Sequence, residues 1–494
     1  MATVMDPKTD NLCYDVVIIG AGISGINFAY RLQKKHPDLR YCILEERHEV
    51  GGTWSLFQYP GIRSDSDLFT FGFAWRPWTG CNAIAEGQLI REYIRESAEQ
   101  KGIVPRIRFR HRVDRMDWST HQKLWSLHAS TDNSTAAVIL QARFVMMGTG
   151  YYDYHEPLKT EIPGIEQFQG TVIHPQFWPS DIDYVNKNVV IVGSGATAIT
   201  LLPSLADKAS SVTMLQRSPS YVMSVSKEDA VERFIRWSCP ERLAARLIRF
   251  KWIFLPLVLV SFCRQFPNLA RRLCLSITGK ELPEQVPLDP HFMPRYYPWE
   301  QRMCMCPDGD FFRCLRNGKA SVVTDHIEAV TPKSIRLRSG NELHPDIIVT
   351  ATGLKMRIAG GIRITVDGSP FFIQDHFMWK CTMVDGLPNV VFALGYVDAS
   401  WTLGAHATAQ LACRILKQMK EEGISMVAPR CGERDRSGMK EKSFLNLNAT
   451  YVKKGNSVFP KVGDQPPWEP RSYYWKDLIR ARWGDIRTDM DWSH

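Results

Sequence analysis

Two glycine-rich turns, far apart in the chain, have the residue types and spacing that bind the pyrophosphate of a dinucleotide. The first covers residues 20–25 (GAGISG) and the second covers residues 193–198 (GSGATA). Glycines let the backbone approach the phosphates, and the N-terminus of the following helix directs its amide groups at their charge. We therefore expect the chain to bind two dinucleotides.

The residue that follows the second strand of each unit predicts which dinucleotide that unit binds. Glu45 follows the apolar run that starts at Tyr41. An acid there accepts hydrogen bonds from a ribose and repels a 2′-phosphate, so the first unit suits FAD. Arg217 follows the corresponding run from Val212. A guanidinium binds a phosphate through two hydrogen bonds, so the second unit favours NADPH over NADH.

Buried strands must hold these turns in place. Continuous apolar runs at 14–20 and 189–193 lead into the two turns, as expected of parallel strands covered on both faces. Strand ends at 148–150, 346–353 and 389–395 close on small residues. These ends resemble the crossovers of flavoproteins in the FAD/NAD(P)-binding superfamily. We expect an α/β fold with two Rossmann-like domains, the NADPH-binding domain inserted in the FAD-binding domain.

The domain boundaries follow from these strand ends and from a change of periodicity. We expect residues 1–152 to form the first part of the FAD-binding domain and residues 153–344 to form the NADPH-binding domain. Residues 345–494 would return to the FAD-binding domain and end in a surface wrap. Helical periodicity replaces the strand pattern between about residues 224 and 295, which predicts a helical insert in the NADPH-binding domain.

The composition is that of a soluble globular protein and excludes several functions. The net charge of +9 is spread over 494 residues without a dense basic tract, so we expect no nucleic acid partner. Twelve cysteines show neither a disulfide framework nor a convincing metal-ligand spacing, which predicts reduced thiols, no metal and a cytoplasmic location. Residues 1–12 are polar and do not resemble a signal peptide.

An apolar segment at 252–263 has basic residues on both sides. A membrane-spanning helix needs about twenty apolar residues, so this segment is too short to span a bilayer, and Pro256 interrupts it. We expect a buried helix. The alternative is a basic-rimmed apolar patch that makes a weak peripheral contact with a membrane surface.

A third motif lies between the two glycine turns, at residues 168–179 (FQGTVIHPQFWP). It places Phe168, Gly170, His174 and Trp178 in an F-x-G-x-x-x-H-x-x-x-W-P pattern. With the two turns, this motif resembles the fingerprint of the Baeyer–Villiger monooxygenases, which are class B flavoprotein monooxygenases. That resemblance implies FAD, NADPH and O2, with insertion of one oxygen atom next to a ketone carbonyl.

Further motifs extend the resemblance over residues 14–474. They are GGTW at 51–54, YPGIRSDSD at 59–67, LQRSP at 215–219 and ATGL at 351–354. They are most similar to the subgroup typified by the ethionamide-activating monooxygenase. This subgroup implies a small-molecule substrate that is a ketone or contains sulfur, with oxidation of sulfide or thioamide sulfur as a side activity.

The resemblance also implies a catalytic pair. Arg302 falls on the arginine that stands over the flavin and stabilises its peroxide anion, and Asp65 falls on the carboxylate that orients this arginine. A fixed cation lowers the pKa of such an anion and stabilises the developing oxyanion. Many members have a lysine just before the arginine, where this chain has Gln301, so the preference for NADPH would depend more on Arg217. We expect His174 to position the domains.

The expected cofactor-binding residues surround the two turns and the motifs that follow them. Around the first turn they are Gly20, Gly22, Ser24, Gly25, Glu45, Thr53, Trp54, Ser55, Leu56, Arg63, Ser64, Asp65 and Val113. Around the second turn they are Gly193, Ser194, Gly195, Ala196, Thr197, Ala198, Thr200, Arg217 and Ser218.

Three alternative functions share some of these features. An N- or S-oxygenating flavin-containing monooxygenase has a similar fingerprint, but it ends in Phe or Tyr where this chain has Trp178. A disulfide reductase would need a redox-active cysteine pair after the first turn, and Cys42 and Cys81 are too far apart in the sequence. A dinucleotide-binding sensor without enzymatic activity would not need Asp65 and Arg302.

Overall fold

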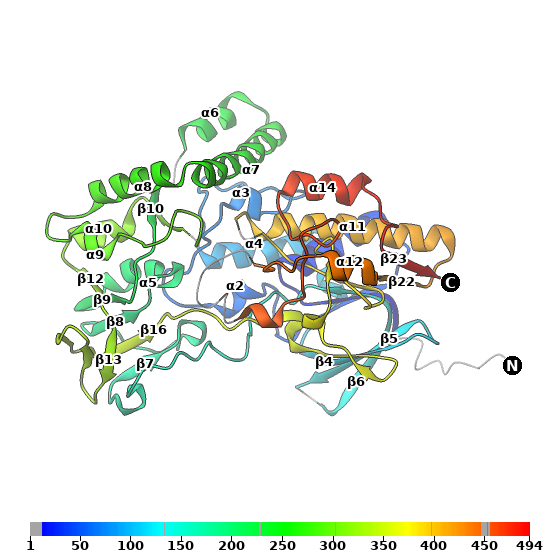
Figure 1. Ribbon diagram of the computed structural model, residues 1–494, viewed down its shortest axis with the longest axis horizontal. Helices are drawn as coiled ribbons and strands as arrows, with labels where there is room; N and C mark the ends of the chain where they lie inside the picture. Colours follow the sequence, from blue (N-terminus) through cyan, green and yellow to red (C-terminus); the bar gives the residue numbers. More distant parts are fainter. Residues whose placement is uncertain are drawn as a thin grey trace.

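The computed structural model describes residues 12–132, 134–226, 229–301, 303–396, 398–445, 452 and 455–494. Two sheets organise this part of the chain, as Figure 1 shows. The strands of the second sheet fall within residues 171–350, between β6 and β17 of the first sheet. The expected α/β fold is therefore confirmed, with one nucleotide-binding unit inserted in the other.

The first sheet has nine strands in the described part of the chain. Its order is β18-β17-β4-β5-β6-β1-β2-β3, with β21 paired to β6. The strands are β1 (Cys13–Ile19), β2 (Tyr41–Leu44), β3 (Ile107–Arg108), β4 (His111–Ser119), β5 (Leu124–Thr131), β6 (Ser134–Met147), β17 (Arg363–Val366), β18 (Ser369–Pro370) and β21 (Val390–Phe392). β21, β6, β1, β2 and β3 are parallel, and β4–β6 form an antiparallel meander.

Both faces of the first sheet are covered, which explains its continuous apolar strands. One face packs against α1 (Ile23–Lys35), α4 (Gly87–Gln100) and α11 (Trp401–Glu422). In β1, Val16 and Ile18 face this core, whereas Val17 and Ile19 face a second core on the β4–β6 side. The short helices α2 (Thr53–Leu56) and α3 (Leu68–Phe71) follow β2.

The second sheet is parallel throughout and has the order β12-β9-β8-β16-β7. Its strands are β7 (Thr171–Ile173), β8 (Asn188–Val192), β9 (Ser211–Gln216), β12 (Ala320–Thr324) and β16 (Ile347–Thr350). One face packs against α5 (Ala196–Ala206) and α10 (Asp310–Arg316). The other face is covered by β13 (Ile327–Val330), β14 (Ile335–Leu337) and β15 (Glu342–Leu343).

Helices fill the segment between β10 (Val222–Val225) and its parallel partner β11 (Cys304–Pro307). They are α6 (Ala230–Ser238), α7 (Glu241–Gln265), α8 (Pro267–Glu281) and the short α9 (Leu288–His291). The expectation of a buried helix at 252–263 is wrong. Phe254, Leu255, Val258 and Leu259 are 42–54% exposed, and Pro256 lies inside α7 without ending it. No helix of the described residues meets the length and apolarity that crossing a bilayer requires.

The C-terminal part, expected to be a surface wrap, also contributes to the core. Trp468 is 1% exposed and Ala481 of α14 (Tyr474–Trp483) is 3% exposed, and both pack in the core that includes α11. The remaining elements are β19 (Met378–Trp379), β20 (Met383–Val384), β22 (Met426–Pro429), α12 (Glu433–Gly438), β23 (Met490–Ser493) and the 3₁₀ turns η2 (Val104–Arg106), η3 (Ile165–Gln167), η4 (Pro175–Phe177), η5 (Ile358–Gly361), η6 (Ile373–Asp375) and η7 (Asn456–Val458).

Candidate active site

A cavity of about 820 Å³ lies where the carboxyl ends of β1, β2, β8 and β9 meet, and both glycine turns line it. This is where open parallel sheets bind their ligands. The expected cofactor residues that line it are Gly20, Gly22, Ser24, Glu45, Thr53, Trp54, Arg63, Ser64, Asp65, Val113, Gly193, Ser194, Gly195, Ala196, Thr197, Thr200, Arg217 and Ser218. The other four, Gly25, Ser55, Leu56 and Ala198, are not among its lining residues.

The first turn fits a pyrophosphate. Gly20 has φ +98°, and a Cβ there would lie 2.7 Å from the carbonyl oxygen of Gly148. Gly22 caps α1 without a side-chain hydrogen bond, so the first amides of this helix remain available to an anion. Gly25 has a packing role instead, since a Cβ there would lie 1.9 Å from the carbonyl oxygen of Gly20.

Glu45 is fixed beside the first turn. Its carboxylate accepts hydrogen bonds from the backbone N–H groups of Ala21 at 2.7 Å and Arg47 at 3.0 Å. Burial raises the pKa of this carboxyl above its ordinary value, and the charge of Arg47 opposes that shift. Each carboxylate oxygen has a second lone pair, so Glu45 still has acceptor capacity for ribose hydroxyls.

The second turn leaves open space for another dinucleotide. Gly193 has φ +144°, and a Cβ there would lie 2.3 Å from the carbonyl oxygen of Ala351. A Cβ on Gly195 would have no atom within 4 Å, and Gly195 begins α5 without a side-chain cap. Arg217 follows β9 as Glu45 follows β2, is exposed, and lines the cavity. The residues present therefore fit two dinucleotides.

The motif at 59–67 joins the two nucleotide-binding units. Arg63 forms an ion pair with Asp310 at the start of α10, with Nη2 3.3 Å from Oδ1 and a second contact from Nη1 to Oδ2. Gly61 has φ +72° and packs against Ser204 of α5 so closely that a Cβ would lie 1.8 Å from its Oγ. Burial raises the pKa of Tyr59 to about 12.

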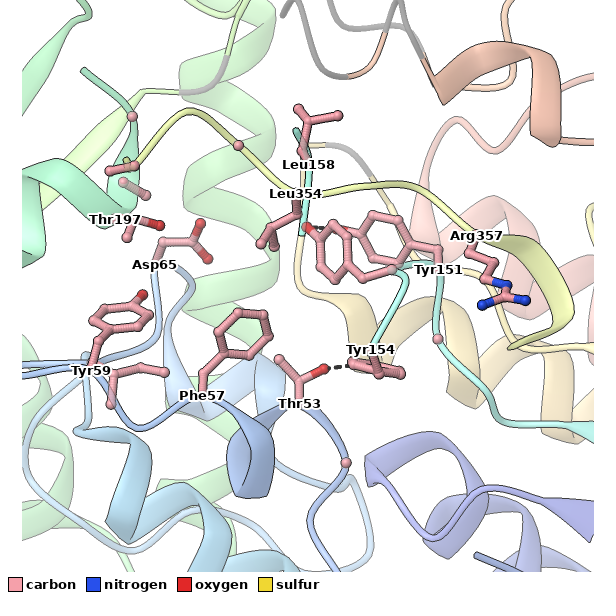
Figure 2. Close-up of a pocket in the computed structure, with 18 of the residues that line it drawn as sticks. Thr53, Phe57, Tyr59, Asp65, Tyr151, Tyr154, Leu158, Thr197, Leu354 and Arg357 are labelled. Carbon is pink, nitrogen blue, oxygen red and sulfur yellow. Dashed lines mark hydrogen bonds between the residues drawn. The ribbon is translucent and has the colours of Figure 1, made fainter. Parts of the chain in front are cut away.

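An aromatic wall faces this motif across the cavity. Figure 2 shows Tyr59 and Asp65 on one side and Tyr151 and Tyr154 on the other. The ring of Tyr151 stacks on Trp401 with centroids 4.6 Å apart. The hydroxyl of Tyr154 lies 2.9 Å from Oγ1 of Thr53. Sequence reasoning missed these tyrosines; their signal was an aromatic run directly after the strand end at 148–150.

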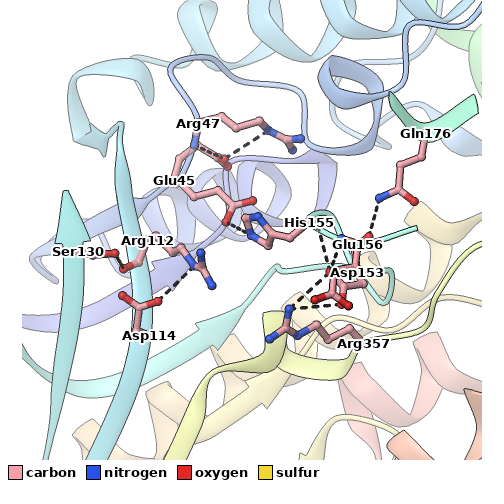
Figure 3. Close-up of polar contacts among 11 residues, drawn as sticks. Glu45, Arg47, Arg112, Asp114, Ser130, Asp153, His155, Glu156, Gln176 and Arg357 are labelled. Carbon is pink, nitrogen blue, oxygen red and sulfur yellow. Dashed lines mark hydrogen bonds and ion pairs between the residues drawn. The ribbon is translucent and has the colours of Figure 1, made fainter. Parts of the chain in front are cut away.

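The two connections between the units are clamped together at Asp153, which is 1% exposed (Figure 3). Its carboxylate accepts hydrogen bonds from the backbone N–H groups of His155 and Glu156 at 3.0 and 3.1 Å. Oδ2 also lies 3.2 Å from Nζ of Lys355 and 3.3 Å from Nη1 of Arg357, both on the return connection after β16. Arg357 lines the cavity and was not expected from the sequence.

The fingerprint residues Phe168, Gly170, His174 and Trp178 do not line the cavity, and their segment contacts the clamp through Gln176. The side-chain amide of Gln176 donates to the carbonyl oxygen of Asp153 at 2.7 Å. Nδ1 of His174 accepts from the backbone N–H of Gln176 at 3.3 Å, and burial lowers the pKa of His174. Trp178 packs against the core between the second sheet and α5. A Cβ on Gly170 would lie 2.5 Å from the carbonyl oxygen of Asp346, and Phe168 packs on the β13–β15 face.

Arg302 lies outside the described residues. Its neighbour Gln301 lines the cavity, as does Cys304. Tyr396 and Trp401, which follow β21, also line the cavity, whereas no described residue of the helices α6–α9 does.

Sequence comparison shows the family. The chain is 44% identical over 474 residues to the FAD-containing monooxygenase EthA of Mycobacterium tuberculosis, covering 96% of each chain. The chain belongs to the FAD-containing monooxygenases. It is also 40% identical to the probable FAD-binding monooxygenase AlmA of Acinetobacter baylyi, over 95% of each chain. Residues 17–237 match the family model described as pyridine nucleotide-disulphide oxidoreductase.

Solved structures share the fold of this FAD-containing monooxygenase. Oxidised steroid monooxygenase bound to NADP has a TM-score of 0.75 at 18% identity, with 97% of this chain and 99% of that chain covered. The OTEMO complex with FAD and NADP gives the same TM-score, identity and coverage. The expectations of an enzyme and of FAD as its cofactor are confirmed by the family.

Proposed function

We propose that this FAD-containing monooxygenase is a Baeyer–Villiger enzyme. It would convert a ketone, O2, NADPH and a proton into an ester or lactone, NADP⁺ and water. The observation that carries the proposal is that both dinucleotide turns, Asp65 and Gln301 line one cavity. A single cavity of this kind would bring a hydride donor, a flavin and a carboxylate of the expected catalytic pair to the same place.

The residues that line the cavity would have distinct roles in binding and catalysis. Bound FAD, supplied with electrons by NADPH, would provide the reactivity toward O2. Glu45 would hold the ribose of FAD, and Arg217 would hold the 2′-phosphate of NADPH through charge-assisted hydrogen bonds. Asp65 would orient Arg302, whose fixed charge stabilises negative charge on oxygen. Tyr151 and Tyr154 would shield the reacting centre from water.

The clamp at Asp153 supports a structural role for the fingerprint. Gln176 binds the first connection and Asp153 binds the second through Lys355 and Arg357. His174 would therefore position the two domains and take no part in proton transfer.

Oxidation of sulfide or thioamide sulfur is proposed as a side activity. The described free cysteines agree with a cytoplasmic location for the enzyme.

Product analysis with a substrate panel tests this proposal. The FAD-loaded enzyme is incubated with NADPH and a ketone, a sulfide or a tertiary amine, and NADPH consumption is compared with product formed. We expect esters or lactones from ketones and sulfoxides from sulfides. Sulfoxide or N-oxide with no ester from any ketone would favour the N- or S-oxygenating alternative.

A further inference from the structure

The helices α6, α7 and α8 leave a large apolar face uncovered. On α7, Leu243, Leu247, Phe250, Phe254 and Val258 are 40–66% exposed and recur every three or four residues, so they form one stripe. α7 contacts both α6 and α8. Monomeric soluble proteins rarely expose contiguous apolar patches beyond a few hundred Å², and larger ones mark interaction sites.

The neighbouring helices extend this stripe. Trp237 of α6 is 81% exposed, and Leu269, Leu273 and Ile277 of α8 are 45–48% exposed with a spacing of four residues. Figure 1 shows α6, α7 and α8 along one edge of the molecule, with α6 standing away from both sheets. We call the exposed apolar surface of α6–α8 the apolar face.

The opposite side of the insert is fixed to the FAD-binding domain. Arg249 donates to the carbonyl oxygens of Phe69 at 2.7 Å and Gly72 at 2.9 Å. Ile248 is 1% exposed and packs against Phe69, and Arg264 pairs with Asp398 at 3.0 Å. Because this side is anchored, the apolar face cannot turn inward without breaking these contacts.

The charge of the insert indicates which partner the apolar face fits. Residues 229–281 contain ten Lys or Arg and four Asp or Glu, a net charge of +6 within a chain of +9. Arg242, Arg246, Arg272 and Lys280 are exposed and form no ion pair with any described residue. A second copy would bring two such positive surfaces together, whereas an anionic lipid headgroup complements them.

We propose that the apolar face docks this enzyme on the surface of an anionic lipid bilayer. The aromatic and aliphatic side chains of α6–α8 would enter the interface between headgroups and acyl chains, and the exposed cations would contact the headgroups. No described helix is long and apolar enough to cross a bilayer, so the contact would be peripheral. Salt would weaken it, since exposed charges are screened beyond about 10 Å at 0.1 M ionic strength.

Vesicle flotation of the full-length, FAD-loaded enzyme tests this proposal. The probes are vesicles of phosphatidylcholine alone and vesicles of phosphatidylcholine with phosphatidylglycerol. We expect the enzyme to float with the anionic vesicles at low salt and to be released at high salt. Replacing Arg242, Arg246 and Arg272 together by Gln should lower the partition coefficient on the order of a hundredfold.

A second variant tests the apolar contribution. It combines Trp237→Ser, Phe250→Ser and Phe254→Ser and should reduce flotation at least about tenfold while FAD content and NADPH oxidation are retained. The matched controls Phe372→Ser and Lys333→Gln change exposed residues outside the insert and should float like the wild type.

Three results would overturn the proposal. One is wild-type enzyme that does not float with anionic vesicles at low salt. Another is flotation of both triple variants at the wild-type level. The third is a wild-type dimer in sedimentation velocity that the triple Ser variant converts to a monomer, since a second copy would then cover the apolar face.

Discussion

Arg63 of the first nucleotide-binding unit and Asp310 of the second form an ion pair with two contacts, and both side chains are largely buried. Arg63 lies two residues before Asp65, and both line the cavity. Asp310 lies at the start of α10, which packs against α5 and thus against the second glycine turn. The pair therefore links the segment that carries Asp65 to α10 and, through α10, to α5, which follows the second glycine turn.

Breaking this ion pair should lower the stability of the enzyme. Asp310→Ala leaves Arg63 partly buried without its partner, so we expect a loss of about 2–4 kcal/mol in the free energy of unfolding. The Michaelis constant for NADPH should rise, and FAD should stay bound. Urea unfolding measures the free energy of unfolding, and steady-state kinetics measure the Michaelis constant for NADPH. Glu99→Ala, which breaks the exposed pair of Glu99 with Arg95, is the control and should cost less than about 1 kcal/mol.

The clamp at Asp153 should make stability depend on acid pH. Burial opposes ionisation, but the hydrogen bonds from His155 and Glu156 and the cations of Lys355 and Arg357 hold the pKa of Asp153 below its ordinary value. Its stabilising effect is therefore present above about pH 4, the ordinary range of Asp, and is lost as pH falls through the folded pKa. Asp153→Asn should lower Tm at neutral pH, and the difference from wild type should shrink as pH falls. A difference independent of pH would contradict this assignment.

Glu45→Ala should release FAD, because it removes the acceptor expected for the ribose and also the partner of the Ala21 amide. We expect the dissociation constant for FAD to rise about 10–100-fold. Reconstitution of the apoprotein, followed by flavin fluorescence, gives this constant. Glu49→Gln, nearby and outside the cavity lining, should bind FAD as wild type does. Unchanged affinity in Glu45→Ala would remove the ribose role.

Arg217→Ala should affect the two coenzymes differently. If the guanidinium binds the 2′-phosphate, kcat/KM for NADPH should fall about 100-fold and kcat/KM for NADH should change little. Equal losses for both coenzymes would show that Arg217 does not contact this phosphate. Stopped-flow reduction of the flavin by each coenzyme isolates the relevant step.

Short sequence motifs predict much of this fold, because the turns and strand ends that they form depend mainly on the residues within each motif. The turn at 20–25 needs glycine for its φ angle and for close approach to Gly148, and Glu45 follows one strand later. Tyr154 and Arg357 were missed because two separate connections bring them to the cavity, and no short pattern encodes that meeting. The exposure of α7 was also missed, since an apolar stripe has the same sequence whether protein or lipid covers it.

The measurement that tests the central claim most directly is isotope incorporation. The FAD-loaded enzyme turns over NADPH and a ketone under ¹⁸O₂, and mass spectrometry examines the product. We predict an ester or lactone that carries one ¹⁸O atom, and loss of this product on the order of 10²–10³-fold in Arg302→Ala with FAD still bound. Ester formation by Arg302→Ala at the wild-type rate would remove this role from Arg302. Unlabelled ester, or NADPH oxidation by the wild type that yields no ester from any ketone, would contradict the proposed Baeyer–Villiger function.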